Sequence, residues 1–78
     1  MSAELPQLSA REAIAAFEHL GFSVLPHRGK GHTIMAKPGH AALLSIPNHR
    51  QLKRGTLRSL LRDAGIGVTE FVRVTRGQ

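Results

Sequence analysis

Residues 53–65 read KRGTLRSLLRDAG, a stretch that combines an apolar stripe with a row of arginines. The apolar side chains recur at three- and four-residue spacing, which brings them to one face of a helix. They are Leu57, Leu60, Leu61 and Ala64. Gly65 follows, and glycine is common just past a helix C-terminus. The stretch predicts an amphipathic helix whose apolar face packs on a core.

Arg54, Arg58 and Arg62 lie four residues apart and form a basic ridge along this helix. Lys53 and the hydroxyl of Thr56 stand at its start, where free backbone N–H groups and the helix dipole favour a phosphate. A ridge of this kind can also be a merely solvated face. Together with the helix start, it indicates contact with a phosphate backbone and not with a base sequence.

An earlier helix is predicted by Ser9 and Glu12, which have the spacing of a capping box. Apolar residues then recur at helical spacing up to Leu20, and Gly21 supplies a stop. The predicted helix runs from Ala10 to Leu20.

Between the two helices, glycine and proline divide the chain into short segments typical of strands. The turns are Gly29-Lys30-Gly31 and Pro38-Gly39, and Pro47 closes the last segment. The predicted strands are Phe22 to Arg28, Thr33 to Met35 and Ala41 to Ile46. Short links between them favour an antiparallel meander.

The order helix, strand, strand, strand, helix predicts an α+β fold, in which a three-stranded antiparallel sheet carries two helices on one face. The tail from Thr69 to Val74 fits either a short helix or a strand, and its pattern does not separate the two. The 78 residues suffice for a single domain over residues 1–78.

The charge is strongly polarised along the chain. The formal net charge is +6, and residues 26–62 hold eight basic side chains without one carboxylate. Such a segment favours a polyanion partner over a merely solvated surface. Cysteine is absent, no apolar run is long enough for a membrane span, and the N-terminus lacks the features of a secretion signal. We therefore expect a cytoplasmic protein that does not bind a membrane.

The five histidines do not indicate a metal site. No pair has the i, i+4 spacing of a helical zinc site, and the carboxylates that a two-metal nuclease needs are scattered outside the basic segment. We expect neither metal nor cofactor, and no serine-type triad. His19 is expected to close the first helix, and His27 and His40 to face solvent.

Metal-free cleavage of RNA remains open, because the ribose 2′-hydroxyl is a built-in nucleophile. Such an enzyme needs a histidine to move protons and cations to stabilise charge that grows in the transition state. His32 stands after a glycine turn, between Lys30 and Lys37. A structural role for a histidine at such a position is the commoner case.

Four segments resemble the HicA toxin family in order and spacing, over roughly residues 9–72. They are Leu20-Gly21-Phe22, Gly31-His32-Thr33-Ile34, Ile46-Pro47-Asn48-His49, and the stretch from Lys53 to Ile66. HicA proteins are toxins of bacterial toxin–antitoxin pairs and act as metal-independent mRNA interferases. Their fold resembles the double-stranded-RNA-binding domain. The resemblance implies that His32 is the catalytic histidine of the family's Gly-Ser-His motif, which here reads Lys30-Gly31-His32.

The resemblance also implies two partners, mRNA and a HicB-like antitoxin protein that covers the active site. The side chains expected to hold RNA are Lys30, Lys37, His49, Lys53, Arg54, Thr56 and Arg58. For His49, a structural role that holds the loop by hydrogen bonds to backbone is the alternative. Two rival functions stay open: a non-catalytic RNA-binding module of the same fold, and a protein-binding adaptor.

Overall fold

The computed structural model describes residues 4–26 and 31–77 of the chain. Its elements are α1 (Ala10–His19), β1 (Ser23–Val24), β2 (His32–Ala36), β3 (Leu44–Pro47), α2 (Arg54–Ala64) and α3 (Val68–Thr75). The predicted order of helix, three strands and helix is confirmed, and a third helix follows it. This α+β order is that of the double-stranded-RNA-binding domain, as the resemblance implied.

The sheet is an antiparallel meander with the strand order β1-β2-β3. Met35 of β2 lies opposite Leu44 of β3, and Thr33 lies opposite Ile46. Met35, Leu44 and Ile46 are fully buried. Because side chains alternate along a strand, these pairs face the helices and the intervening residues lie on the outer face.

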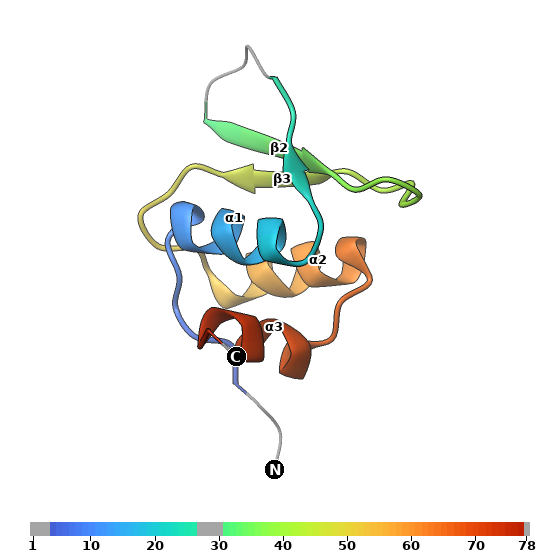
Figure 1. Ribbon diagram of the computed structural model, residues 1–78. Helices are drawn as coiled ribbons and strands as arrows, with labels where there is room; N and C mark the ends of the chain where they lie inside the picture. Colours follow the sequence, from blue (N-terminus) through green and yellow to red (C-terminus); the bar gives the residue numbers. More distant parts are fainter. Residues whose placement is uncertain (1–3, 27–30, 78) are drawn as a thin grey trace.

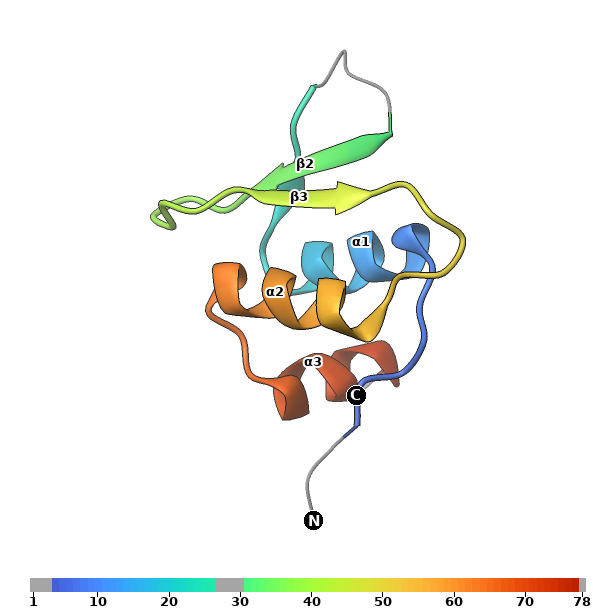
Figure 2. The ribbon, with the colours of Figure 1, turned by 180° about the vertical axis from the view of Figure 1, so that it is seen from behind.

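Helices α1 and α2 both pack on β3 and lie on the same face of the sheet, as predicted (Figure 1). Helix α3 lies on the far side of those two helices, away from the sheet, as both views show (Figure 2). The tail is therefore a helix and not a strand. Its Phe71 and Val72 are buried, so α3 adds a third layer to the core.

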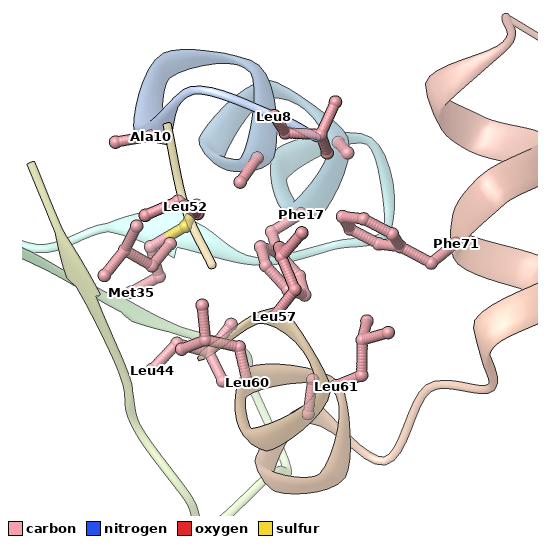
Figure 3. Packing of buried hydrophobic residues seen from close by; sticks show 14 of the residues in the cluster. Leu8, Ala10, Phe17, Met35, Leu44, Leu52, Leu57, Leu60, Leu61 and Phe71 are labelled. Carbon is pink, nitrogen blue, oxygen red and sulfur yellow. The ribbon is translucent and has the colours of Figure 1, made fainter. Parts of the chain in front are cut away.

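The core contains three buried phenylalanines, of which Figure 3 labels Phe17 and Phe71. The Phe17 ring lies 5.1 Å from that of Phe71 and 5.9 Å, edge to face, from that of Phe22. Leu57 and Leu61 of α2 pack against the same cluster. All three rings are buried, so none is available on the surface as a platform for bases.

Both ends of α1 follow from short sequence signals. The Ser9 hydroxyl accepts from the Glu12 N–H (3.1 Å), and the Glu12 carboxylate accepts from the Ser9 N–H (2.9 Å), which is the predicted capping box. At the other end, the Phe22 N–H donates to the Phe17 carbonyl and Gly21 has a φ of 102°. This 6→1 bond with a left-handed glycine sets the direction in which the chain enters the sheet.

Two strand boundaries differ from the prediction. Strand β1 covers only Ser23–Val24, and Arg28, where it was expected to end, lies outside the described residues. The third strand begins at Leu44 and not at Ala41, and it includes Pro47. A proline fits there because β3 is an edge strand and needs no further N–H donor.

His40 explains the late start of β3. Its Nε2 lies 2.6 Å from the Asp63 carbonyl oxygen at the end of α2, and its ring stands edge-on to Phe22 at 5.7 Å. These contacts hold the loop between β2 and β3 against the helix layer, so residues 41–43 leave the ladder. The prediction that His40 faces solvent is wrong, and His27 lies outside the described residues.

No helix in residues 4–26 and 31–77 is both long enough and apolar enough to span a bilayer.

Replacing Ser9 by alanine removes the capping box. We expect the Ser9→Ala variant to lose about 1 kcal/mol of unfolding free energy in urea denaturation. Ser59→Ala, an exposed change inside α2, is the matched control and should be neutral or slightly stabilising, because alanine is the better helix former. An equal loss from both variants would contradict the assigned role of the cap.

The cap also carries a pH dependence. Hydrogen bonds from the Ser9 backbone N–H, then from its side chain, hold the pKa of Glu12 below its usual value. A depressed pKa adds stability to the fold at pH values above the usual glutamate pKa. This added stability is lost as the pH falls through the lowered pKa. Glu12→Gln removes the titrating carboxylate, so the stability gap between the parent and this variant should narrow in acid, as urea titrations at a series of pH values would show.

Candidate functional site

One end of the molecule gathers the start of β2, the end of β3 and the start of α1 (Figure 1). His32 opens β2 opposite Pro47, the last residue of β3. The Asn48 N–H donates to the Gly31 carbonyl (2.8 Å), and the Thr33 hydroxyl donates to the Asn48 side-chain oxygen (2.8 Å). Gly31 has a φ of 89°, a conformation that side chains other than glycine rarely adopt.

His32 is exposed and lies on the outer face of the sheet. Its neighbour Thr33 pairs with Ile46 on the helix side, so His32 and Ile34 point the other way. No helix covers this outer face among the described residues (Figure 2). A large polymer can therefore approach the imidazole directly.

The loop after β3 joins the sheet to the helix layer. The His49 carbonyl accepts from the Ala10 N–H (2.9 Å), and the Leu52 N–H donates to the Leu8 carbonyl (2.7 Å). His49 and Arg50 are exposed between these two anchors. The backbone of His49 holds the loop, and the residue is exposed to solvent.

The start of α2 carries the predicted basic group. Lys53 is the N-cap and makes no side-chain capping bond, and the first turn contains no acid. Thr56 is half-buried, whereas Arg58 and Arg62 are exposed. The free backbone N–H groups at the start of α2 therefore lie among the basic side chains of Lys53, Arg54 and Arg58, and the first turn of this helix contains no carboxylate.

Arg54 has a structural contact that the sequence did not reveal. Its Nε donates to the Leu5 carbonyl oxygen (3.1 Å), which ties the N-terminal segment to α2. Arg54, Arg58, Leu5 and Glu4 together line a small cavity of about 160 Å³. The basic ridge of α2 therefore borders the N-terminal segment, which carries the carboxylate of Glu4.

Lys37 lies far from His32, at the opposite end of β2. Its Nζ is 5.7 Å from the centre of the Phe22 ring, and its stem passes Gly21. Five residues of strand separate the two side chains by about 16 Å. Lys30, the other lysine predicted to flank His32, lies outside the described residues.

Sequence reasoning missed Arg11, Asn48 and Arg50 as neighbours of the site. Arg11 is on α1 and Arg50 on the loop, and both line one groove because Ala10 bonds to His49. In the sequence, only the family resemblance of the Pro47-Asn48-His49 segment indicated that this loop lies near the site. Within the described part of the chain, no three His, Asp or Glu side chains come together to hold a metal ion.

The tie between Arg54 and Leu5 can be tested by a matched pair of variants. Arg54→Met should lower the unfolding free energy by about 1 kcal/mol, because a hydrogen bond from a charged group to a backbone carbonyl is lost. Arg58→Met, one turn along the same face, should change it by less than about 0.5 kcal/mol. Urea denaturation measures both, and equal effects would show that the bond does not stabilise the fold.

A family model described as HicA toxin of bacterial toxin-antitoxin matches residues 10–66. The match covers more than half of the chain and runs from α1 through α2, so it includes His32, the loop after β3 and the basic helix start. No curated protein matches the chain.

Proposed function

The chain belongs to the HicA toxin family of bacterial toxin–antitoxin systems, and on that premise we propose that it is a metal-independent mRNA interferase in which His32 transfers a proton. The observation that carries the proposal is the position of His32. It is exposed on an open sheet face, beside the loop that presents His49 and Arg50.

The RNA supplies the nucleophile of the reaction. The ribose 2′-oxygen bonds to the adjacent phosphorus as its proton leaves, and the bond from phosphorus to the 5′-oxygen breaks as that oxygen gains a proton. The products are a 2′,3′-cyclic phosphate and a 5′-hydroxyl. His32 acts as the general acid or the general base in one of these two proton transfers, a contribution of about 10²- to 10⁴-fold, and water takes up or supplies the other proton.

Cations near the scissile phosphate stabilise the charge that develops on its oxygens. His49 and Lys53 lie at either end of the loop beside His32, and Thr56 adds a hydroxyl in the first turn of α2. Arg54 and Arg58 continue the basic surface along α2. Lys37, at the other end of β2, would bind a phosphate several nucleotides away, and we also assign Lys30 to the RNA backbone.

A non-catalytic RNA-binding module is the second candidate. Gly31 stands where the family motif has serine, and its φ of 89° is one that serine rarely adopts. The hydroxyl that the motif places before the histidine is therefore missing here, and a serine would be strained at this position. The same basic face would then hold RNA without cutting it.

Membership of the family implies a cognate antitoxin, and we assign its docking to the outer face of the sheet. Leu43 is 55% exposed and Leu25 is 36% exposed. Leu25 donates its N–H to the Ile34 carbonyl, so it lies beside Ile34 on the outer face. His32 shares that face with Ile34, and a protein seated on the apolar patch would cover His32 as well.

The catalytic role is tested by incubating the protein with a long single-stranded RNA in EDTA. The parent should release fragments, and His32→Ala should reduce the rate by about 10²-fold or more while its circular dichroism stays unchanged. His19→Ala is the matched control, because His19 is an exposed histidine at the far end of α1. It should cut like the parent.

Retained cleavage by His32→Ala would remove the assigned role. Intact RNA with all three proteins, together with a mobility shift, would favour the RNA-binding module. Intact RNA without a mobility shift would leave the protein-binding adaptor as the remaining function.

The antitoxin surface is tested by Leu43→Asp. We expect the affinity for the cognate antitoxin to fall at least about tenfold, because an exposed apolar anchor becomes a charge that the interface must desolvate. The kcat for RNA cleavage at saturating RNA should not change, since Leu43 lies at the end of the sheet away from His32. Ser59→Asp, on α2, is the control and should bind normally; calorimetric titration showing equal affinities would contradict the assignment.

A further inference from the structure

A groove of about 700 Å³ lies between α1 and the loop that follows β3. Its lining comes from two short segments, residues 9–18 of α1 and residues 48–50 of the loop. The hydrogen bond from the Ala10 N–H to the His49 carbonyl holds the two walls at a fixed separation. The volume lies within the range of pockets that take a small organic molecule.

The chemistry of the two walls is different. The α1 wall is largely apolar, since Ala10 is buried, Ile14 is half-buried against the core, and Ala15 is exposed. The loop wall carries the amide of Asn48 and the imidazole of His49, each of which can meet the donors and acceptors on the edge of a base.

Charge determines which part of a ligand lies where. Arg11 and Arg50 are both exposed at the groove, one on each wall. Glu18, four residues after Ile14 on α1, supplies a negative charge further along the helix. A phosphate is therefore attracted toward Arg11 and Arg50 and repelled by Glu18, so a nucleotide would enter with its phosphate at the arginines.

The loop wall of the groove begins beside the strand pair that contains His32. Asn48, which lines the groove, follows Pro47, the sheet partner of His32, and its N–H donates to the Gly31 carbonyl. The Asn48 side-chain oxygen accepts from Thr33 on the helix side, whereas the His32 ring points to the outer face. An RNA chain that bends around this edge of the sheet can therefore contact both His32 and the groove.

We propose that this groove binds one unstacked base of the RNA substrate, from a nucleotide near the cleaved bond. The inference rests on the proposed ribonuclease function and adds a subsite to it. The flat base lies on the aliphatic wall of Ile14 and Ala15, its phosphate lies toward Arg11 and Arg50, and the side-chain NH2 group of Asn48 donates to the edge of the base. Because the three phenylalanines are buried, this aliphatic surface takes the place of an aromatic platform.

The first test measures nucleotide binding in the groove and does not require cleavage. The His32→Ala protein is titrated with each of the four nucleoside 5′-monophosphates and followed by amide NMR shifts. We expect the amides of Ile14, Asn48 and Arg50 to move with at least one nucleotide. In a double variant that adds Ala15→Leu, which fills the groove with a good helix former, these shifts should disappear.

The second test uses cleavage. Ala15→Leu in the parent should lower kcat/KM on single-stranded RNA by about tenfold, or change which base flanks the cuts. The reason is that the leucine side chain fills the surface on which the base binds. Ala41→Leu, an exposed alanine in the loop before β3, is the control and should cut as the parent does.

The outcomes separate the two proposals. Nucleotide shifts in the groove without cleavage by the parent would support the subsite and overturn the ribonuclease function. Unchanged rates and unchanged flanking bases in Ala15→Leu would overturn the subsite and leave the ribonuclease function in place. No shifts with any nucleotide would likewise overturn the subsite.

Discussion

The fold and the site both depend on how the chain passes from the sheet to the helix layer after β3. Three backbone hydrogen bonds fix this loop: Asn48 bonds to Gly31, His49 to Ala10, and Leu52 to Leu8. The first holds the loop to the sheet, and the other two hold it to the entry of α1. These bonds fix the positions of the His32, Arg50 and Lys53 backbones relative to one another.

The helices could be predicted because their signals are local. Ser9 and Glu12 form a cap from four consecutive residues, and Gly65 ends α2 with a φ of 70°. The meander also followed from short links between apolar segments. The family match over residues 10–66 agrees with the resemblance seen in the sequence.

What the sequence left undetermined depended on contacts between distant residues. The start of the third strand was misplaced because His40 bonds to the Asp63 carbonyl, 23 residues away. Arg54 was assigned to RNA alone, whereas its Nε also donates to Leu5. The tail fitted helix and strand equally, and the burial of Phe71 against Phe17 decided for the helix. The assignments of His32 and of the RNA-binding residues remain predictions.

The two faces of the sheet have separate tasks in this account. The inner face holds the core, while the outer face carries His32 and the exposed Leu25, with the exposed Leu43 in the loop just before β3. RNA and an antitoxin would therefore compete for one surface, and inhibition needs no change of shape in the toxin. The groove beside α1 lies at the edge of this surface and adds a contact for the substrate.

The central claim is that the RNA supplies its own nucleophile and that the protein transfers protons and stabilises charge without a metal ion. The most direct measurement compares an RNA oligonucleotide containing one mapped cleavage site with the same oligonucleotide bearing a single 2′-deoxynucleotide at that site, both in EDTA. The account predicts that the first is cut to a 2′,3′-cyclic phosphate and a 5′-hydroxyl, and that the second stays intact. Cleavage of the deoxy-substituted strand, or cleavage only after a divalent metal is added, would contradict it.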